Sequence, residues 1–376
     1  MQSTRLGPGD TIDRYELLRA LGSGGSGTVF EARDALIGRR VAVKLLHVRE
    51  GAASARRAEA RFLREGRIAA QIRHPHVVDV FDVGIDRDVP FLVMELVEGE
   101  TLADLVAREE RLAVARAVEI VLPILSATAE LHAGGVIHRD IKPANVLLPA
   151  GRALCPKLAD FGASWCDSDS PPITRPGSLV GTPEYLAPEL IRFGKRANER
   201  SDQYALGVLL YECITGERPF EGPTTYQRLH AAVSADLVPP SSRSPSVPVA
   251  FDTVVMRAMQ RDPLRRFPSV EALGEALLAF AAPPVAEHWC GVFARLRGSG
   301  LRAAAASVRP AAASPLSGTR HTAPVDAPRA PTADDRALLI RDGVAVVTRG
   351  DLMAMVWKTS ARLHRTRWVF DVMESL

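Results

Sequence analysis

The sequence changes character near residue 100, and this change constrains the fold more than any other feature. Between residues 15 and 90, β-forming residues cluster in three segments with turn signals between them, and one segment, 52–72, has helical periodicity. The expected strands are 15–21, 28–33 and 40–46. From about residue 101 the apolar residues recur at helical spacing. The expected helices are 101–108, 113–132, 201–215, 226–233, 251–260 and 269–280. We therefore predict an α+β fold with a small β-rich lobe and a larger helical lobe.

Residues 282–334 differ in composition from both lobes. They are dominated by Ala, Pro, Arg and Ser, as in the run AAAASVRPAAASPLSG. A stretch of this kind has few apolar side chains, so it predicts a flexible linker. Residues 335–376 regain Leu, Val, Met and Trp. We expect a folded domain over 15–281, a linker over 282–334 and a short C-terminal segment to which the pattern assigns no function.

The composition excludes several classes of protein. With 47% hydrophobic residues and a net charge of +3, the chain is too apolar and too weakly charged to be disordered as a whole. Its apolar runs fall far short of the ~18 residues that span a membrane, and the N-terminus lacks a signal-peptide core. The four cysteines are too scattered for a disulfide framework. No block of Lys and Arg recurs, so no nucleic-acid partner is expected. We expect a cytoplasmic protein without a transmembrane segment.

A glycine-rich run, GSGGSGTV, occupies Gly22–Val29. Glycines let a backbone approach phosphates closely and turn its N–H groups toward them. A Rossmann nucleotide site needs a helix directly after the glycines, whereas Val29–Arg33 looks like a second strand. The pattern alone also fits an ordinary hairpin tip. A hairpin that covers a nucleotide is the favoured interpretation.

Lys44 interrupts the apolar strand VAVKLL. One interpretation is an edge lysine that faces solvent. Its β-branched and leucine neighbours favour an inward ammonium, which needs an anionic partner. In the downstream helix Glu65 lies on the apolar stripe, and Glu59 beside it is the weaker candidate. We predict an inward-facing ion pair between Lys44 and Glu65.

The segment Val136–Leu148 alternates polar and apolar residues, and Pro143 prevents a continuous helix. Asp140, Lys142 and Asn145 could supply a proton acceptor, a phosphate-binding cation and a metal ligand. A polar loop with caps would explain any one of them. Downstream, Asp160-Phe161-Gly162 follows a strand-like segment.

The order of these motifs is that of a known family. GSGGSGTV, VAVK, HRDIKPAN, DFG and APE follow one another as in the eukaryotic-type (Hanks-type) protein kinases, and the chain resembles the bacterial serine/threonine branch. Each motif alone occurs by chance, whereas five in this order leave little room for coincidence. The resemblance covers about three quarters of the chain, residues 15–281. It implies a two-lobed protein-kinase-like fold with a flexible C-terminal extension.

The resemblance implies four catalytic residues. Lys44 would grip the α- and β-phosphates of ATP, and Glu65 would hold Lys44 in place. Asp140 would accept or orient the proton of the substrate hydroxyl. Lys142 would steady the transferring phosphoryl group.

The cofactors implied are ATP and Mg²⁺, with Mn²⁺ as an alternative metal ion. Asn145 and Asp160 would hold the metal ion. The glycine segment would cover the phosphates, apolar side chains would sandwich the adenine, and Met94 would lie at the back of the pocket beside the hinge. The implied ATP-binding residues are Leu21, Gly22, Ser23, Gly24, Gly25, Ser26, Gly27, Val29, Ala42, Lys44, Met94, Glu95, Val97 and Leu147. Many relatives carry a bulkier residue at the position of Ser26, so closure over the γ-phosphate is expected to be looser.

The resemblance also implies contacts that brace the larger lobe. Asp202 begins a segment that is apolar on all sides, which predicts a buried central helix, and it would anchor the catalytic loop. Glu189 would pair with Arg266. Lys142 and the run Gly181–Tyr185 resemble serine/threonine kinases more than tyrosine kinases.

The segment 164–178 predicts a phosphorylation switch. Arg139 places a guanidinium beside Asp140, and a phosphate would suit a bidentate arginine contact. Thr174 is the first choice of site, because it lies eight residues before Thr182, where bacterial relatives often carry such a threonine, and Ser178 is the second. Thr182 is expected instead to contact Asp140 and Lys142. The alternative is a loop that serves only as a substrate platform.

The expected function is ATP-dependent transfer of the γ-phosphoryl group to Ser and Thr hydroxyls of proteins in bacterial signalling, with autophosphorylation. The expected partners are ATP and protein substrates, together with a second copy of the chain for trans-autophosphorylation. Two alternatives remain: a pseudokinase scaffold, and a small-molecule phosphotransferase of kinase-like fold.

Overall fold

The computed structural model describes residues 6–25, 27–46, 59, 62–64, 66–151, 155–160, 182–194, 196–307, 340–341 and 344–345. The chain divides into two units, Met1–Pro310 and Ala311–Leu376. In the second unit, β10 (Ile340–Arg341) pairs antiparallel with β11 (Val344–Ala345). The following description concerns the first unit.

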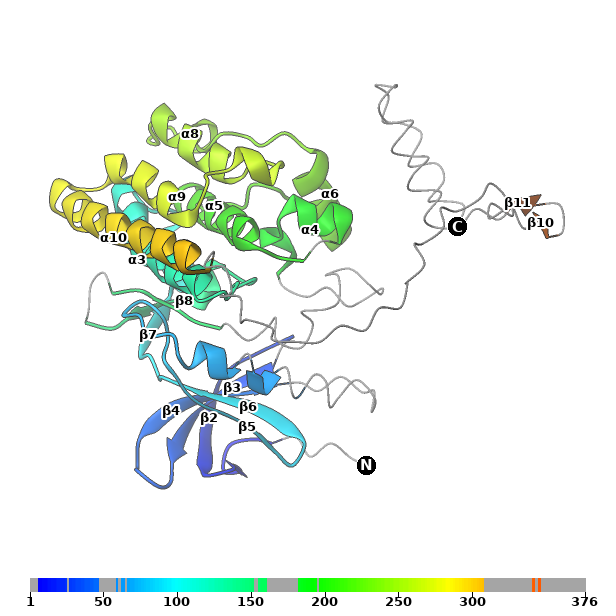
Figure 1. The fold of residues 1–376 in the computed structure, drawn as a ribbon, viewed down its shortest axis with the longest axis vertical. Coiled ribbons are helices and arrows are strands. Elements are labelled where there is room, and N and C mark those ends of the chain that lie inside the picture. The colour runs from blue at the N-terminus through cyan, green and yellow to red at the C-terminus, as the bar shows by residue number, and fades with distance from the viewer. Residues whose placement is uncertain are drawn as a thin grey trace, which may run out of the picture. The chain divides into compact units, whose positions relative to one another are not determined.

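The N-terminal part of the first unit is a six-stranded sheet in the order β1-β2-β3-β4-β6-β5, drawn in blue and cyan in Figure 1. Every neighbouring pair is antiparallel. The three strands predicted from the sequence are present. The strands are β1 (Thr11–Ile12), β2 (Tyr15–Gly24), β3 (Gly27–Asp34), β4 (Arg40–Leu46), β5 (Val80–Asp86) and β6 (Val89–Met94).

Strand β4 is buried on both faces, and its alternating side chains separate two clusters. Val41, Val43 and Leu45 pack in a cluster confined to the sheet. Ala42 and Leu46 face the other way and join the core shared with the helices. Because successive side chains of a strand point to opposite faces, Lys44 lies on this second face.

The hairpin of β2 and β3 ends in the glycine run. Ser23 pairs with Thr28 and Gly24 with Gly27, so the glycines lie between two strands as predicted. Gly27 must be glycine because a Cβ there would lie 2.2 Å from the carbonyl oxygen of Leu45 on β4. The backbone of the hairpin therefore approaches that of β4 closely at Gly27.

The described residues after β6 are mainly helical, apart from a three-stranded sheet in the order β7-β8-β9. These strands are β7 (Gly99–Thr101), β8 (Val146–Pro149) and β9 (Lys157–Leu158). The α-helices are α2 (Leu102–Glu109), α3 (Val114–Ala133), α4 (Pro188–Phe193), α5 (Glu199–Thr215), α6 (Thr225–Ser234), α7 (Pro240–Arg243), α8 (Val249–Ala258), α9 (Val270–Leu277) and α10 (Pro283–Ser307). The short 3₁₀ helices are η1 (Pro143–Asn145), η2 (Pro183–Tyr185), η3 (Pro263–Arg265) and η4 (Leu278–Phe280). No helix in the described part of the chain is long and apolar enough to cross a membrane.

Helix α5 forms the centre of this larger lobe. Nearly all of its residues from Ser201 to Thr215 are buried, which confirms the prediction from its uniformly apolar sequence. Asn198 caps the helix by accepting from the backbone N–H groups of Arg200 and Ser201. The helix therefore begins at a fixed point, and its first turn can position other parts of the chain.

Helix α10 corrects one prediction. A flexible linker was expected from residue 282, but Pro283–Ser307 form a helix that lies along α3 and α9 (Figure 1). Trp289 and Phe293 are buried there. The averaged composition of 282–334 hid a stripe of apolar residues at helical spacing near its start, which runs through Val285, Trp289, Val292, Phe293 and Leu296. The linker prediction is wrong over this helix, and residues 308–334 lie outside the described residues.

Candidate active site

The loop before η1 is held by the first turn of α5. Asp202 accepts hydrogen bonds from the backbone N–H of His138 (2.9 Å) and of Arg139 (2.8 Å), and from His132 Nε2 (2.8 Å). Burial raises the pKa of the Asp202 carboxyl, but the bonds and charges of His132, His138 and Arg139 outweigh it and hold that pKa below its ordinary value. Arg139 has φ of 69°, a conformation that costs energy in a non-glycine residue and persists only where its surroundings enforce it. The contact implied for Asp202 is present.

A buried polar cluster surrounds Asp140. Lys142 Nζ donates to Asp140 Oδ2 and to Thr182 Oγ1, both at 2.7 Å. Thr182 Oγ1 in turn donates to Asp140 Oδ1 at 3.1 Å. Asn145 Nδ2 donates to the backbone carbonyl of Asp140 (2.7 Å) and to its Oδ2 (3.0 Å). Three predicted site residues, Asp140, Lys142 and Asn145, therefore meet, and the expected contact of Thr182 joins them to the segment before α4.

Asp140 is held in its charged form. Burial raises the pKa of its carboxyl, but the charge and hydrogen bond of Lys142, with smaller effects from His138 and Asn145, hold that pKa below its ordinary value. Each carboxylate oxygen can accept about two hydrogen bonds. Oδ1 accepts only from Thr182 among the described residues, so it retains capacity for a further donor.

Lys44 pairs with Asp160 across the two lobes. Lys44 Nζ donates to Asp160 Oδ1, and the lysine side chain is only 2% exposed. This confirms that the ammonium points inward and excludes the solvent-facing interpretation. Asp160 follows β9 and has φ of 70°. Glu65, the predicted partner of Lys44, lies outside the described residues, as do Phe161 and Gly162. Residues 59, 62–64 and 66–69 are helical, in agreement with the predicted helix.

The apolar residues of the implied adenine site lie together. Ala42 and Met94 pair across β4 and β6 and are each 6% exposed. Val29, Val97 and Leu147 are partly buried and pack against the same cluster. Strand positions on β3, β4, β6 and β8 thus bring residues that are far apart in sequence to one place.

The hinge and the glycine hairpin border this apolar group. The backbone N–H of Glu95 donates to Asp79 (2.9 Å), and its carboxylate accepts from Lys157 Nζ (2.8 Å). Leu21 is 40% exposed. The remaining described residues of the hairpin run are Gly22, Ser23, Gly24, Gly25 and Gly27. Ser26 lies outside the described residues.

The donor set fits a hard divalent cation bound with phosphate. Asn145 Nδ2 is engaged by Asp140, so the amide oxygen is left as a ligand, and the carboxylate of Asp160 is a second. No cluster of three His, Cys, Asp or Glu residues suited to a metal occurs in the described part of the chain. Mg²⁺ does not need one, because it is held by one or two protein oxygens together with phosphates and water.

The segment that carries Thr182 is anchored at its far end by a buried ion pair. Glu189 at the start of α4 accepts two hydrogen bonds from Arg266, at 2.8 Å and 2.7 Å. Arg266 also donates to the backbone carbonyls of Arg200 and Gln260, both at 2.7 Å. The predicted pair of Glu189 and Arg266 is therefore present, in the bidentate geometry that gives the strongest carboxylate contact.

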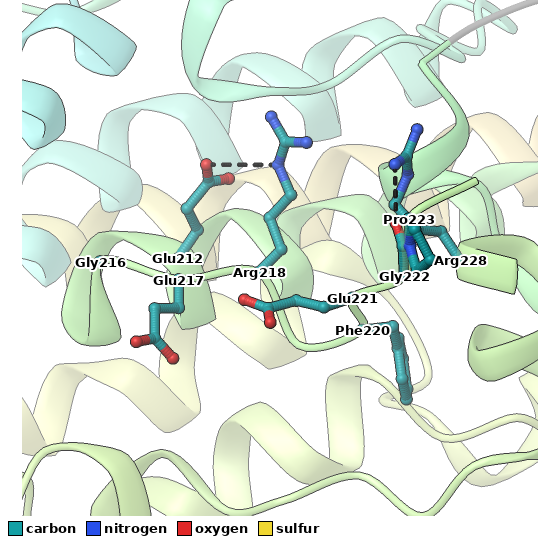
Figure 2. Close-up of a pocket in the computed structure, with 9 residues that line it drawn as sticks. All are labelled: Glu212, Gly216, Glu217, Arg218, Phe220, Glu221, Gly222, Pro223 and Arg228. Atoms are coloured by element: carbon teal, nitrogen blue, oxygen red, sulfur yellow. Dashed lines mark hydrogen bonds and ion pairs between the residues drawn. The ribbon is translucent and has the colours of Figure 1, made fainter. Parts of the chain in front are cut away.

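A pocket of about 830 Å³ opens beside this segment, between the end of α5 and the start of α6 (Figure 2). Arg218 extends toward Glu212, with Nε 3.7 Å from Oε1 of that residue. The Nη1 atom of Arg218 lies 3.3 Å from Glu184 Oε1. Arg228 Nε also lies 3.0 Å from Glu184. Tyr185 donates a hydrogen bond to Glu212. Because Glu184 is two residues from Thr182, the two Cα atoms are at most about 7 Å apart, which places the pocket near the Asp140 cluster.

Comparisons with known proteins agree with this geometry. Residues 15–277 match the family model described as the protein kinase domain. The chain belongs to the protein kinase family. A probable serine/threonine-protein kinase of Corynebacterium efficiens is 41% identical over 264 residues, which cover 68% of this chain and 39% of the relative. The serine/threonine-protein kinase PknB of Mycobacterium leprae is 39% identical over 264 residues, 69% of this chain and 42% of that kinase.

A solved structure shows the same fold for this protein kinase domain. The PknI kinase domain of Mycobacterium tuberculosis superposes with a TM-score of 0.57 at 28% identity, over 73% of this chain and 99% of that domain. The bacterial serine/threonine branch and the two-lobed fold predicted from the sequence are thereby confirmed. The chain spans about two fifths of the length of the curated relatives named above.

Sequence reasoning missed His138 as part of this kinase site. Its Nε2 donates to the carbonyl of Ala159 (3.1 Å), directly before Asp160. Burial lowers the pKa of His138, which keeps the ring neutral, so Nδ1 can accept from the N–H of Asp140 (3.4 Å). The signal was its place two residues before Asp140, although spacing alone does not reveal a contact across 21 residues.

Proposed function

We propose that this chain is an ATP-dependent protein serine/threonine kinase that transfers the γ-phosphoryl group of ATP to Ser and Thr hydroxyls of proteins. The observation that carries the proposal is the buried cluster of Asp140, Lys142 and Thr182, joined by hydrogen bonds of 2.7 to 3.1 Å. Phosphoryl transfer needs little covalent help from the protein, but it needs an oriented acceptor and fixed charges. The cluster can meet both needs.

Each residue has a role in this proposal. Asp140 Oδ1 accepts the hydrogen of the substrate hydroxyl, and Lys142 Nζ balances charge on the phosphoryl oxygens. Lys44 binds the α- and β-phosphates. In the active enzyme we expect Glu65 to hold Lys44 in place. Asp160 and the amide oxygen of Asn145 would hold Mg²⁺, with Mn²⁺ as the alternative. When bound, the metal ion supplies positive charge to the β- and γ-phosphates.

The adenine is proposed to lie against the apolar group on β3, β4, β6 and β8. Ala42 and Met94 would form its buried wall, and Val29 and Leu147 pack against the same cluster. Val97 would bind the adenine edge through its backbone N–H, which donates no hydrogen bond within the described residues. The glycine hairpin, from Leu21 to Gly27, would cover the phosphates.

A polypeptide substrate is favoured over a small molecule by the segment from Thr182 to Glu189. It is tied to the catalytic cluster at one end and to Arg266 at the other. The pocket of Figure 2 adjoins it, and its volume of about 830 Å³ is enough for a side chain of a bound peptide. A small phosphotransferase has no need of such a braced platform beside its acceptor site.

The pseudokinase alternative is disfavoured by the described catalytic positions. Lys44, Asp140, Asn145 and Asp160 each carry a side chain able to perform the proposed role, and Asp140 is held in its charged form. A scaffold that only borrowed the fold would not need this arrangement.

Regulation belongs to the same proposal. Thr174 and Ser178, the two predicted phosphosites, lie outside the described residues. We propose autophosphorylation in trans between two copies of the chain. We also propose a role in bacterial signalling and a cytoplasmic location. We propose residues 15–281 as the catalytic domain and 335–376 as a separate C-terminal segment.

Mass spectrometry of bacterial lysate proteins tests the proposed function. Lysate treated with the purified chain, ATP and MgCl₂ is compared with lysate treated with the Asp140→Asn variant. We expect phosphoserine and phosphothreonine peptides that appear only with the wild type. New phosphate found only on small molecules would support the phosphotransferase alternative. Equal phosphopeptides in both samples would contradict the proposal.

A further inference from the structure

Helix α10 touches the part of the kinase fold that leads into Asp160. Its buried residue Phe293 packs so closely on α9 that a Cβ at Gly274 would lie 2.4 Å from the Phe293 ring. Arg297 adds an ion pair of 2.7 Å with Glu275. These contacts fix the helix in place. One turn earlier, the ring of Trp289 lies 6.0 Å from that of Phe293 and also contacts a neighbour outside α9 and α10.

The ring of Trp289 packs against the ring of His76, with centroids 5.7 Å apart and planes tilted by 51°. His76 belongs to the loop that precedes β5. Trp289 is 8% exposed, so the tryptophan of this contact is almost fully shielded from water. The aromatic pair therefore joins α10 to a loop that none of the catalytic contacts includes.

His76 holds the strand before Asp160. The backbone N–H of Leu158 on β9 donates to the carbonyl of His76 at 2.8 Å, and His76 Nδ1 donates to the carbonyl of Pro156 at 2.9 Å. Val78 donates back to Leu158 at 3.0 Å. One edge of the segment 156–158 is thus fixed by the segment 76–78.

The other edge of this segment is fixed by the catalytic loop. Ala159 donates to the carbonyl of Asn145 at 2.8 Å and accepts from His138 Nε2 at 3.1 Å. Asp160 comes next, in a left-handed conformation that its surroundings must enforce. The position of Asp160 therefore depends on both neighbouring segments, and one of them, 76–78, packs against Trp289 through His76.

We propose that Trp289 is a positioning residue, which acts through His76 and β9 to hold Asp160 where it binds the metal ion of the nucleotide. The inference rests on the proposed function for the role of Asp160, but the packing argument does not. It gives α10 a part in catalysis, although the helix lies beyond the segment that matches the kinase family model. Groups that orient a metal ligand from behind change metal affinity by about tenfold or more when they are removed.

The test compares Trp289→Leu with Phe293→Leu. Both variants replace a buried ring of α10 by leucine, but only the first removes the ring that touches His76. Hydrogen–deuterium exchange at the amide of Leu158 reports on β9 without any need for activity. A fluorescent ATP analogue titrated with MgCl₂ reports on the metal site. Thermal unfolding measures the stability lost by each variant.

For Trp289→Leu we expect faster exchange at Leu158, and the MgCl₂ concentration for half-maximal analogue binding should rise by about tenfold. Phe293→Leu should lower the melting temperature by about as much as Trp289→Leu does. Its exchange rate at Leu158 and its MgCl₂ concentration for half-maximal binding should stay within about twofold of wild type. Trp289→Phe, which keeps a ring, should restore both readouts most of the way.

A second variant guards against a failure of Trp289→Leu to fold. His76→Asn keeps an N–H donor for Pro156 but removes the ring, so it should reproduce the exchange and MgCl₂ effects. If either variant behaves like Phe293→Leu in exchange and in MgCl₂ dependence, the contact is merely structural and the proposal fails. A wild type with no phosphotransferase activity would refute the proposed function, whereas exchange at Leu158 would still decide whether Trp289 supports β9.

Discussion

Lys44 and Asp160, which are 116 residues apart in sequence, form an ion pair between β4 and the residue after β9. The lysine is 2% exposed and the aspartate 28% exposed. A buried ammonium requires an anion, and this carboxylate supplies one. In the proposed ATP complex the lysine would bind phosphate oxygens and the aspartate would hold the metal ion.

The first prediction concerns the cation of this pair. Lys44→Met should reduce phosphoryl transfer by at least about a hundredfold, or ~3 kcal/mol, because it removes the cation proposed to bind the α- and β-phosphates. The fold should survive, since Asp160 remains partly solvated. Steady-state transfer to a protein substrate measures the loss. Arg33→Met, which removes an exposed cation from the same sheet, is the control and should keep full activity. A Lys44→Met variant that keeps more than about a tenth of the wild-type rate would show that the assignment is wrong.

The second prediction concerns the carboxylate. Asp160→Asn keeps the shape of the side chain but loses the negative charge that Mg²⁺ prefers. ATP binding should become insensitive to MgCl₂, and transfer should be lost with either Mg²⁺ or Mn²⁺. Calorimetric titration of ATP with and without MgCl₂ checks this. Asp79→Asn, at a partly exposed aspartate that pairs with Arg73, serves as the control. Unchanged metal-dependent binding by Asp160→Asn would rule out its role.

The third prediction concerns the pair of Glu189 and Arg266, which fixes the platform segment. Arg266→Met should lower the free energy of unfolding by about 3–5 kcal/mol, because it leaves a buried carboxylate without a partner. The double variant with Glu189→Gln should recover part of that loss. Chemical denaturation of the single and double variants provides the measurement. A loss in the double variant equal to the sum of the losses in Arg266→Met and Glu189→Gln would mean that the pair is not coupled.

The fourth prediction concerns His74, whose Nε2 lies 3.1 Å from Ser126 Oγ. Burial, with smaller effects from His76 and Lys157, lowers the pKa of His74 to about 4. The unfolded chain takes up a proton near pH 6.5, and the folded chain does so only near pH 4. The contribution of His74 to the free energy of unfolding is therefore complete above pH 6.5, and it is lost as the pH falls from about 6.5 to about 4. His74→Gln should flatten the dependence of melting temperature on pH between 7 and 4.5. Identical pH profiles for wild type and variant would contradict the assignment.

Much of this structure could be predicted from local sequence, because local rules dominate there. Strand β4 has the predicted bounds, since a short run of β-branched and leucine residues leaves little choice. The buried helix α5 could also be predicted, because a uniformly apolar segment must lie in a core. The cluster of Asp140, Lys142 and Asn145 lies within six residues, so one loop brings the three together.

The contacts that escaped prediction join segments that are distant in sequence. Composition over 282–334 averaged the apolar stripe around Trp289 with a polar tail, so α10 was taken for linker. The hydrogen bond of Tyr185 with Glu212 and the contact of Trp289 with His76 depend on how helices pack. Spacing within one segment carries no information on such packing. Glu65, the predicted partner of Lys44, lies outside the described residues, and the ion pair of Lys44 with Asp160 from the other lobe was not predicted.

The measurement that tests the central claim most directly is phosphoryl transfer by Asp140→Asn beside its affinity for ATP. The variant keeps the hydrogen-bonding shape of the side chain but removes the charge that accepts the proton of the hydroxyl. We predict that transfer from γ-labelled ATP to protein Ser and Thr falls by at least about a hundredfold, with ATP affinity within about threefold of wild type. A variant that binds ATP normally and still phosphorylates protein at more than about a tenth of the wild-type rate would contradict the account.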